Sequence, residues 1–149
     1  NLNKKTTSMH INDYQLKDFP SVTFDKIRYG DTDRQGHVNN AVFSAFLETG
    51  RVELLYDPDF PGLSDDTSFV IASLNLVFIR EINWPGKVDI GTGILKIGRG
   101  SITIFQKLFQ NDVLVASAET VVVQVNHIQK QSTPLSEKAK ASLEKWLLD

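Results

Sequence analysis

Four long stretches with the composition of β-strands, separated only by short turns, constrain the fold of this 149-residue chain most strongly. They are rich in Val, Ile, Thr and Phe, and they comprise Ser68–Ile82, Val88–Ile97, Ser101–Gln110 and Val113–Ile128. The turns between them are Trp84-Pro85-Gly86, Gly98-Arg99-Gly100 and Asn111-Asp112. A parallel crossover needs about a dozen residues or more, so turns this short predict antiparallel neighbours in a meander.

A helix that is apolar around most of its circumference precedes these strands. Apolar residues recur at three- and four-residue steps from Val38 to about Leu55, and Phe43, Leu47 and Leu54 add a second apolar face. The remaining polar stripe is narrow and consists of Asn40, Ser44, Glu48 and Arg51. A helix with so little polar surface is usually buried.

The predicted elements follow the order strand, buried helix, four antiparallel strands and closing helix. The first strand is Val22–Tyr29, and the closing helix is Ser136–Asp149, with Ser136 as a plausible N-cap. An antiparallel sheet curled around the central helix buries both elements, so we expect one α+β domain over residues 1–149. The polar segment Asn1–Ser8 precedes the only methionine and is interpreted as a tag remnant or a disordered end without a role in the fold.

Composition excludes several classes of function. Cysteine is absent, which excludes a disulfide framework, a Cys nucleophile and thiolate metal sites. No apolar stretch approaches the ~20 residues of a membrane-spanning helix, and no signal-peptide pattern is found, so a soluble cytoplasmic protein is the default expectation. The net charge is -2 with both signs interspersed, and the lack of a basic stripe argues against nucleic-acid binding.

The most informative stretch is Ile27–Leu55, which reads IRYGDTDRQGHVNNAVFSAFLETGRVELL. It resembles the hotdog thioesterases of the 4-hydroxybenzoyl-CoA thioesterase type and their acyl-CoA and acyl-carrier-protein relatives. Those proteins carry a Y/F-x-D-x-D-x-x-G-x-V-x-N/Y loop followed by an L-E-x-A-R helix, and the matching residues here are Asp31, Asp33, Gly36, Val38, Asn40, Glu48 and Arg51. Weaker similarity extends over most of Val22–Ile128, and the resemblance implies the hotdog fold. Gly50 departs from the pattern, because relatives commonly have alanine there.

Thioester hydrolysis needs a group that attacks the carbonyl or activates water, and a donor that stabilises the developing oxyanion. The resemblance implies that Asp33 is the catalytic carboxylate, either as nucleophile through a mixed anhydride or as general base for water. Free N–H groups near Asn39 and Asn40 lie at the positive end of the helix dipole, and the resemblance assigns the oxyanion donor to the N–H near Asn40. Asp31 is interpreted as a turn residue, and Asn39 is also a suitable N-cap.

Other charged residues have competing interpretations. Glu48 has two interpretations. It either pairs with Arg51, one turn on, or acts across a subunit interface as in another branch of hotdog enzymes. Within one chain Glu48 is ~12 Å from the Asn40 N–H, so it could share a carbonyl with that N–H only from a second subunit. His37 is interpreted as a pocket residue that contacts substrate or caps the helix. The resemblance places the coenzyme A phosphates near strand ends and the surface between subunits, with Arg99, Lys96 and Lys130 as candidate contacts.

The sequence therefore predicts hydrolysis of an acyl-CoA or acyl-carrier-protein thioester to free acid and thiol, without a cofactor or a metal. Strands such as Val121-Val122-Val123 are apolar on both faces, which predicts pairing into a homodimer or homotetramer. Two alternatives are a hotdog dehydratase or hydratase and a non-catalytic acyl-CoA-binding module. The dehydratase His-Phe-Pro-Gly arrangement is not found, because Asp59 precedes Phe60-Pro61-Gly62. The acyl group stays open, since pocket depth depends on side chains of two subunits.

Overall fold

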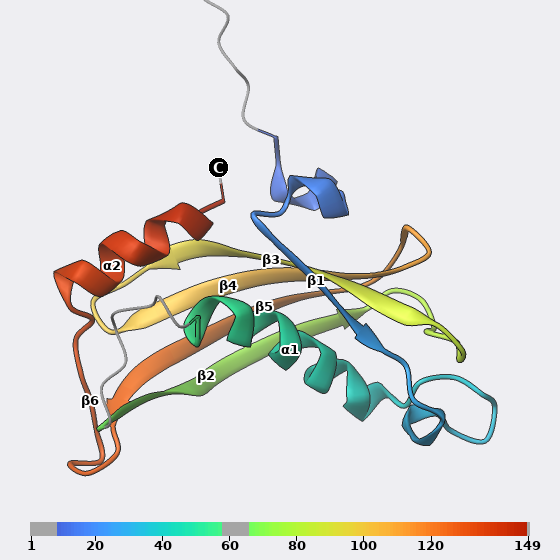
Figure 1. Ribbon diagram of the computed structural model, residues 1–149, viewed down its shortest axis with the longest axis horizontal. Coiled ribbons are helices and arrows are strands. Elements are labelled where there is room, and N and C mark those ends of the chain that lie inside the picture. The colour runs from blue at the N-terminus through green and yellow to red at the C-terminus, as the bar shows by residue number, and fades with distance from the viewer. Residues whose placement is uncertain (1–8, 58–65, 149) are drawn as a thin grey trace, which may run out of the picture.

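The computed structural model of the protein describes residues 9–57 and 66–148. Figure 1 shows a strongly curved antiparallel sheet with one long helix lying across its concave face. The strands are β1 (Ser21–Lys26), β2 (Thr67–Phe78), β3 (Lys87–Ile97), β4 (Ser101–Gln110), β5 (Val113–Asn126) and β6 (Gln131–Ser132). The α-helices are α1 (Phe43–Leu55) and α2 (Glu137–Leu143). Short 3-10 helices are η1 (Ile11–Asp13), η2 (Leu16–Asp18), η3 (Tyr29–Asp31), η4 (Asn40–Val42) and η5 (Glu144–Trp146). The predicted α+β hotdog architecture is confirmed.

Some sequence predictions fall on residues that lie outside the described ranges. These are the segment Asn1–Ser8, most of the loop Asp57–Asp66 and the last residue of the closing helix. The described part of that helix is shorter than predicted, because α2 ends at Leu143 and continues only as η5. Its predicted start is confirmed, since Ser136 Oγ accepts a hydrogen bond from the Ala139 N–H at 3.0 Å.

The strand order is β1-β3-β4-β5-β2, with β6 paired to β5. The predicted meander is confirmed for β3, β4 and β5 but is wrong for β2, which pairs with β5 instead of β3. The reason is that β2 ends at Phe78 rather than at Ile82, so the connection 79–86 is long enough to cross the end of the sheet. The N–H groups of Ile79 and Arg80 both donate to the Val115 carbonyl, at 2.9 and 3.0 Å, where this crossing begins.

α1 packs closely against the centre of the sheet, as its apolar surface predicts. Leu47 is fully buried, and Gly50 marks the closest approach of helix and sheet. A Cβ atom at Gly50 would lie 2.5 Å from Gln106 Nε2 and 2.6 Å from both Ile90 Cγ2 and Thr92 Oγ1. Gln106 Nε2 donates to the Leu47 carbonyl at 2.9 Å and to Thr92 Oγ1 at 3.0 Å. A glycine at this position therefore lets a sheet side chain hydrogen-bond the helix backbone.

Residues 9–20, which include η1 and η2, cover the face of the sheet opposite α1 (Figure 1). The ring of Phe19 stacks on that of Phe105 with centroids 6.0 Å apart. The buried Lys107 Nζ donates to the carbonyls of Asn12 at 2.8 Å and Tyr14 at 3.1 Å, which holds the segment in place. Both faces of the central strands are thus covered within one chain.

The two outer edges of the sheet differ. The edge of β3 is covered first by β1 and then by the C-terminal segment, where the Leu148 N–H donates to the Ile94 carbonyl at 2.8 Å. The outer edge of β2 pairs with no strand among residues 9–57 and 66–148. Exposed apolar side chains follow this edge and its continuation, namely Val70, Ile71, Leu74, Val77, Phe78 and Ile79. An unpaired apolar edge of this length is a template for pairing with another strand.

Candidate active site

Asp33 lies in a tight turn between η3 and η4. Its N–H donates to the His37 carbonyl at 2.8 Å, and its own carbonyl accepts from Gly36, whose φ of 78° suits glycine. The carboxylate atom Oδ1 accepts hydrogen bonds from the N–H groups of Gln35 at 2.8 Å and His37 at 3.3 Å. These bonds fix the carboxylate, whereas Oδ2 accepts no hydrogen bond from residues 9–57 and 66–148, and the side chain is exposed to solvent.

Asp31 has the structural role that the sequence predicts. It is buried, and its Oδ2 accepts the Arg28 N–H at 2.8 Å while its Oδ1 accepts from Arg28 Nη2 at 2.9 Å. Its carbonyl accepts the Asn39 N–H at 2.8 Å, which joins the start of the loop to the start of the helix. Both carboxylate oxygens are therefore engaged, in contrast to Asp33.

The helix begins as the 3-10 turn η4, two residues later than the pattern from Val38 predicts, and becomes α-helical at Phe43. Asn39 is its N-cap, with Oδ1 accepting the Ala41 N–H at 3.0 Å, which confirms the capping interpretation. The Asn40 N–H donates to no residue within the described part of the chain. It is thus an unused donor at the positive end of the helix.

One cavity, of ≈320 Å³, brings three of the predicted site residues together. Asp33, His37 and Asn40 line it, whereas Asn39 does not. The rest of its wall consists of Val38, Phe43, Phe78, Ile79, Arg80 and Glu81. Phe43 and Phe78 meet edge to face with ring centroids 5.0 Å apart, so the cavity wall combines an aromatic pair with the charged side chains of Asp33, Arg80 and Glu81.

The segment Phe78–Glu81 is the part of the site that sequence reasoning missed. Glu81 Oε2 lies 3.0 Å from His37 Nε2, and these side chains are 64% and 29% exposed. The Val38 N–H also donates to the Ile82 carbonyl at 2.8 Å, and this bond holds the Asp33 loop against the segment. The available signal was the charged pair Arg80-Glu81 inside an otherwise apolar stretch, because such charges do not suit a buried strand.

Glu48 lies apart from this cavity, exposed on α1. The ion pairs among described residues are Arg28–Asp31, His37–Glu81, Lys87–Asp89 and Lys140–Glu137, so the expected contact with Arg51 is not formed. Glu48 acts on Arg51 only through its charge: burial lowers the pKa of Arg51, and the negative charge of Glu48 opposes this. In its own chain Glu48 does not contribute to the Asp33 cavity.

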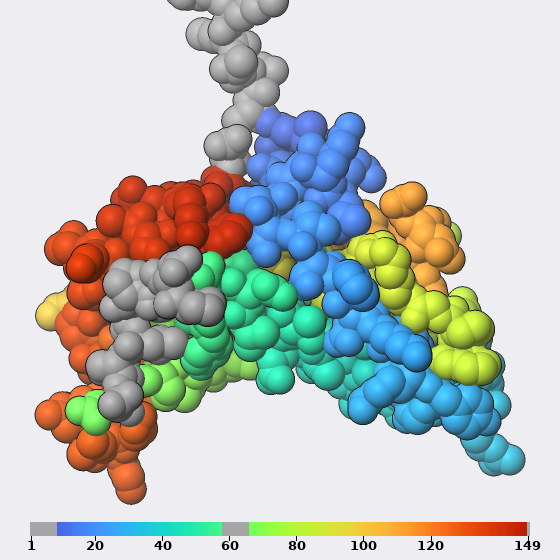
Figure 2. Space-filling view, viewed as in Figure 1, coloured from blue at the N-terminus to red at the C-terminus, as the bar shows by residue number. Residues whose placement is uncertain are grey.

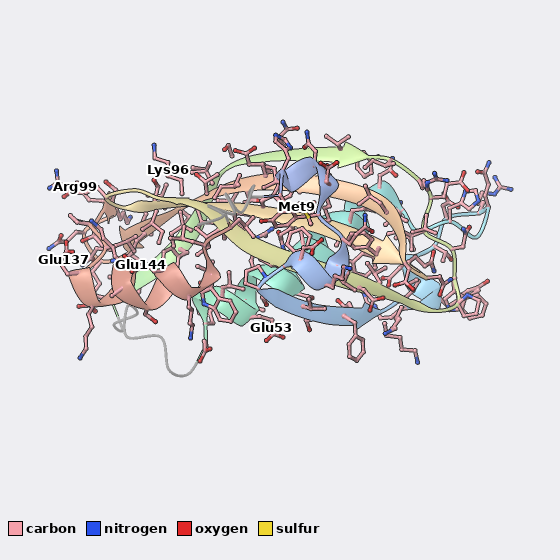
Figure 3. All side chains as sticks on the ribbon, turned by 90° about the horizontal axis from the view of Figure 1, so that it is seen from above. Met9, Glu53, Lys96, Arg99, Glu137 and Glu144 are labelled. Atoms are coloured by element: carbon pink, nitrogen blue, oxygen red, sulfur yellow. The ribbon has the colours of Figure 1, made fainter. Side chains whose placement is uncertain are left out.

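The three cations considered as coenzyme A contacts lie far from Asp33 in the same chain. The Asp33 loop is hydrogen-bonded to residues just before the start of β3. Lys96 lies near the end of β3, and Arg99 follows that end. The 11 residues of β3 span ~35 Å. Figure 3 shows Lys96 and Arg99 together at one end of the molecule, and Lys130 follows β5 in an exposed turn. Arg80 is instead the cation that lines the Asp33 cavity.

The described ranges contain neither a cluster of metal ligands nor a membrane-spanning helix. No three His, Asp or Glu side chains gather there as metal ligands. No helix in those ranges has both the length and the apolar character needed to cross a membrane.

The sequence matches a family model, and the fold matches several solved structures. Residues 27–143 match the model of the thioesterase-like superfamily. A predicted thioesterase from Bacillus stearothermophilus is similar in structure, with TM-score 0.78 and 28% identity over 86% of this chain and 96% of that one. A thioesterase from Thermus thermophilus, complexed with coenzyme A and Zn, has TM-score 0.73 and 26% identity over 86% and 94% of the two chains.

The DHNA-CoA thioesterase from Staphylococcus aureus shares the fold, with TM-score 0.70 and 19% identity over 76% of this chain and 79% of that one. No curated protein sequence matches the chain. Because the family model covers most of its length, the chain belongs to the thioesterase-like superfamily.

Proposed function

We propose that the chain is a thioesterase that hydrolyses an acyl-CoA to the free acid and coenzyme A. The observation that carries this proposal is the presence of an unused carboxylate oxygen of Asp33 and an unused N–H of Asn40 at one cavity. These are the two groups that thioester hydrolysis requires, a base or nucleophile and an oxyanion donor. A solved thioesterase of similar structure is complexed with coenzyme A, which supports this substrate class.

In the proposed reaction the thioester carbonyl oxygen accepts a hydrogen bond from the Asn40 N–H at the start of the helix. As general base, Asp33 Oδ2 takes a proton from the water that attacks the carbonyl carbon, and the tetrahedral intermediate then expels the coenzyme A thiolate. As nucleophile, Asp33 attacks the carbon itself, expels the thiolate and leaves a mixed anhydride that water cleaves. In both routes the acyl group is proposed to pack against Phe43 and Phe78, which line the same cavity as Arg80.

The first test is thiol release by the purified chain from a panel of short, long and aromatic acyl-CoA esters. Release from at least one ester, at a rate that saturates with concentration, is expected. Tight binding of acyl-CoA without thiol release from any ester or acyl-carrier-protein thioester would instead support a binding module. Interconversion of hydroxyacyl- and enoyl-CoA without thiol release would support a dehydratase or hydratase.

Glu81 is proposed to hold the His37 side chain in the orientation that closes one side of the cavity. Glu81→Gln removes the charge from the 3.0 Å contact with His37 Nε2. An exposed pair is worth at most about 1 kcal/mol, so we expect a decrease in kcat/KM of about fivefold or less. The measurement is steady-state thiol release. Glu144→Gln, which changes a distant exposed carboxylate, is the matched control; an equal loss in both variants would refute the role of Glu81.

The chain is further proposed to form a homodimer through the outer edge of β2. No strand of the described part of the chain pairs with this edge, and exposed apolar side chains follow it, so pairing it with the same strand of a second copy would join the two sheets. Lys96, Arg99, Lys130 and Glu48 would then act on a substrate only if the second copy brings them to the Asp33 cavity. Whether two such dimers join into a tetramer depends on further surfaces.

A charge on the β2 edge tests this interface. Val77 is 50% exposed on β2, whereas Val113 is 45% exposed at the start of β5. We expect Val77→Lys to convert the dimer to a monomer in analytical ultracentrifugation, because an edge lysine opposes strand pairing. Val113→Lys should remain dimeric. A dimer that persists in Val77→Lys would show that the copies meet elsewhere.

A further inference from the structure

The connection between β2 and β3 holds the Asp33 loop on both sides of the carboxylate. Before Asp33 in the chain, the Ile27 N–H donates to the Gly86 carbonyl at 2.9 Å. After Asp33, the Val38 N–H donates to the Ile82 carbonyl at 2.8 Å. Because the two bonds lie on either side of Asp33 and both end on the connection, the position of the connection determines the position of the loop.

Two contacts of Trp84 strengthen this attachment. Its N–H donates to the Gly36 carbonyl at 3.5 Å, and its ring meets that of Tyr29 edge to face with centroids 5.3 Å apart. Figure 2 shows the yellow-green connection against the blue segment that follows β1, at one end of the molecule. A displacement of the connection would therefore displace the turn that carries Asp33.

Gln110, the last residue of β4, holds the middle of the connection. Ile82 and Trp84 direct their backbone groups to the Asp33 loop, so Asn83 between them directs its own groups to the opposite side. There Gln110 Oε1 accepts the Asn83 N–H at 3.0 Å, and Gln110 Nε2 donates to the Asn83 carbonyl at 2.7 Å. One side-chain amide thus supplies the donor and the acceptor that a neighbouring strand would offer.

We propose that Gln110 is a positioning residue that keeps the Asp33 carboxylate aligned with the Asn40 N–H. Neither Gln110 nor Asn83 lines the Asp33 cavity, so the amide acts only through the connection. Residues 79–81 of the same connection do line it, which gives Gln110 control over the wall as well as the loop. The effect on catalysis rests on the proposed thioesterase function, whereas the effect on the position of the loop does not.

Gln110→Met tests the proposal, because it keeps the length of the side chain and removes both bonds. A displacement of about 1 Å can cost 100-fold in rate, and the loop keeps its other bonds. We therefore expect kcat for thiol release to fall by about three- to tenfold, while KM changes by less than about twofold. Amide hydrogen exchange, measured by NMR without any ester, should become about fivefold faster or more at the Val38 and Ile27 N–H groups. Exchange in the β4–β5 ladder should stay unchanged, which a general loss of stability would not allow.

Two further variants separate the hydrogen bonds from the polarity of the side chain. Gln110→Glu keeps an acceptor for the Asn83 N–H but places a second acceptor against the Asn83 carbonyl, so it should not restore the wild-type kcat. Gln129→Met makes the same change as the test variant at an exposed glutamine beyond the far end of β5, and it should alter neither measurement.

Wild-type kcat in Gln110→Met, or unchanged exchange of the Val38 N–H, would overturn the proposal. The same holds if Gln110→Glu has full activity, because the donated bond would then be dispensable. Failure of the wild type to release thiol from any ester would overturn the thioesterase function instead. The exchange of the Val38 N–H would then decide alone whether Gln110 holds the loop.

Discussion

Asp33→Asn is expected to lower kcat/KM for thioester hydrolysis by about two orders of magnitude or more, the usual cost of removing a principal acid–base group. The amide keeps the shape of the side chain, and its oxygen can still accept the N–H groups of Gln35 and His37 that fix the turn. It can neither take a proton from water nor attack a carbonyl carbon. The measurement is thiol release from the best ester of the panel, with the free energy of unfolding measured in parallel.

Asp31→Asn separates catalysis from folding in this comparison. Both oxygens of Asp31 bond to Arg28, and the residue is buried, so we expect this variant to lose stability while its folded fraction keeps most of its activity. The opposite pattern, with activity retained in Asp33→Asn, would make Asp33 only a turn residue. The next carboxylate to test would then be Glu48, acting from a second copy.

The elements that could be predicted from the sequence are those whose signal is local. The period of the apolar residues located α1, and the turns Gly98-Arg99-Gly100 and Asn111-Asp112 located two hairpins, because each signal lies within the element it describes. The N-caps Asn39 and Ser136 were predictable for the same reason. The resemblance to a thioesterase family identified the loop with Asp31 and Asp33 as a candidate site. In the structure Asp31 bonds to Arg28 through both carboxylate oxygens, whereas Asp33 accepts backbone N–H groups through one oxygen.

What could not be predicted depends on contacts between distant segments. The pairing of β2 with β5 depends on where β2 ends, and two backbone bonds to Val115 mark that end. The same crossing brings Arg80 and Glu81 to the Asp33 cavity, which no pattern around Asp33 could indicate. Helix spacing favours the Glu48–Arg51 pair, yet the two side chains form no ion pair although both line the same cavity. Local spacing predicts which side chains can meet, and packing decides which do.

Gly50→Ala is expected to destabilise the protein, although alanine favours a helix by ~1 kcal/mol over glycine. The added Cβ would lie 2.5–2.6 Å from three side-chain atoms of the sheet, which real contacts essentially never show. Overpacking of this kind typically costs about 1–3 kcal/mol, and displacement of Gln106 adds the loss of its bonds to Leu47 and Thr92, each about 1 kcal/mol. The balance predicts a net loss of about 2–4 kcal/mol, or a decrease in Tm of several degrees or more.

Gly30→Ala is the matched control, because a Cβ at Gly30 meets no atom within 4 Å. Denaturant unfolding of both variants should show a lower midpoint for Gly50→Ala alone. Gln106→Ala tests the cause: it removes one of the three side chains that the new Cβ would strike, so the two substitutions together should cost less than the sum of their separate costs. If Gly50→Ala is instead as stable as the wild type, the sheet accommodates the methyl group by a small shift, and the close approach at Gly50 contributes little to the packing of α1.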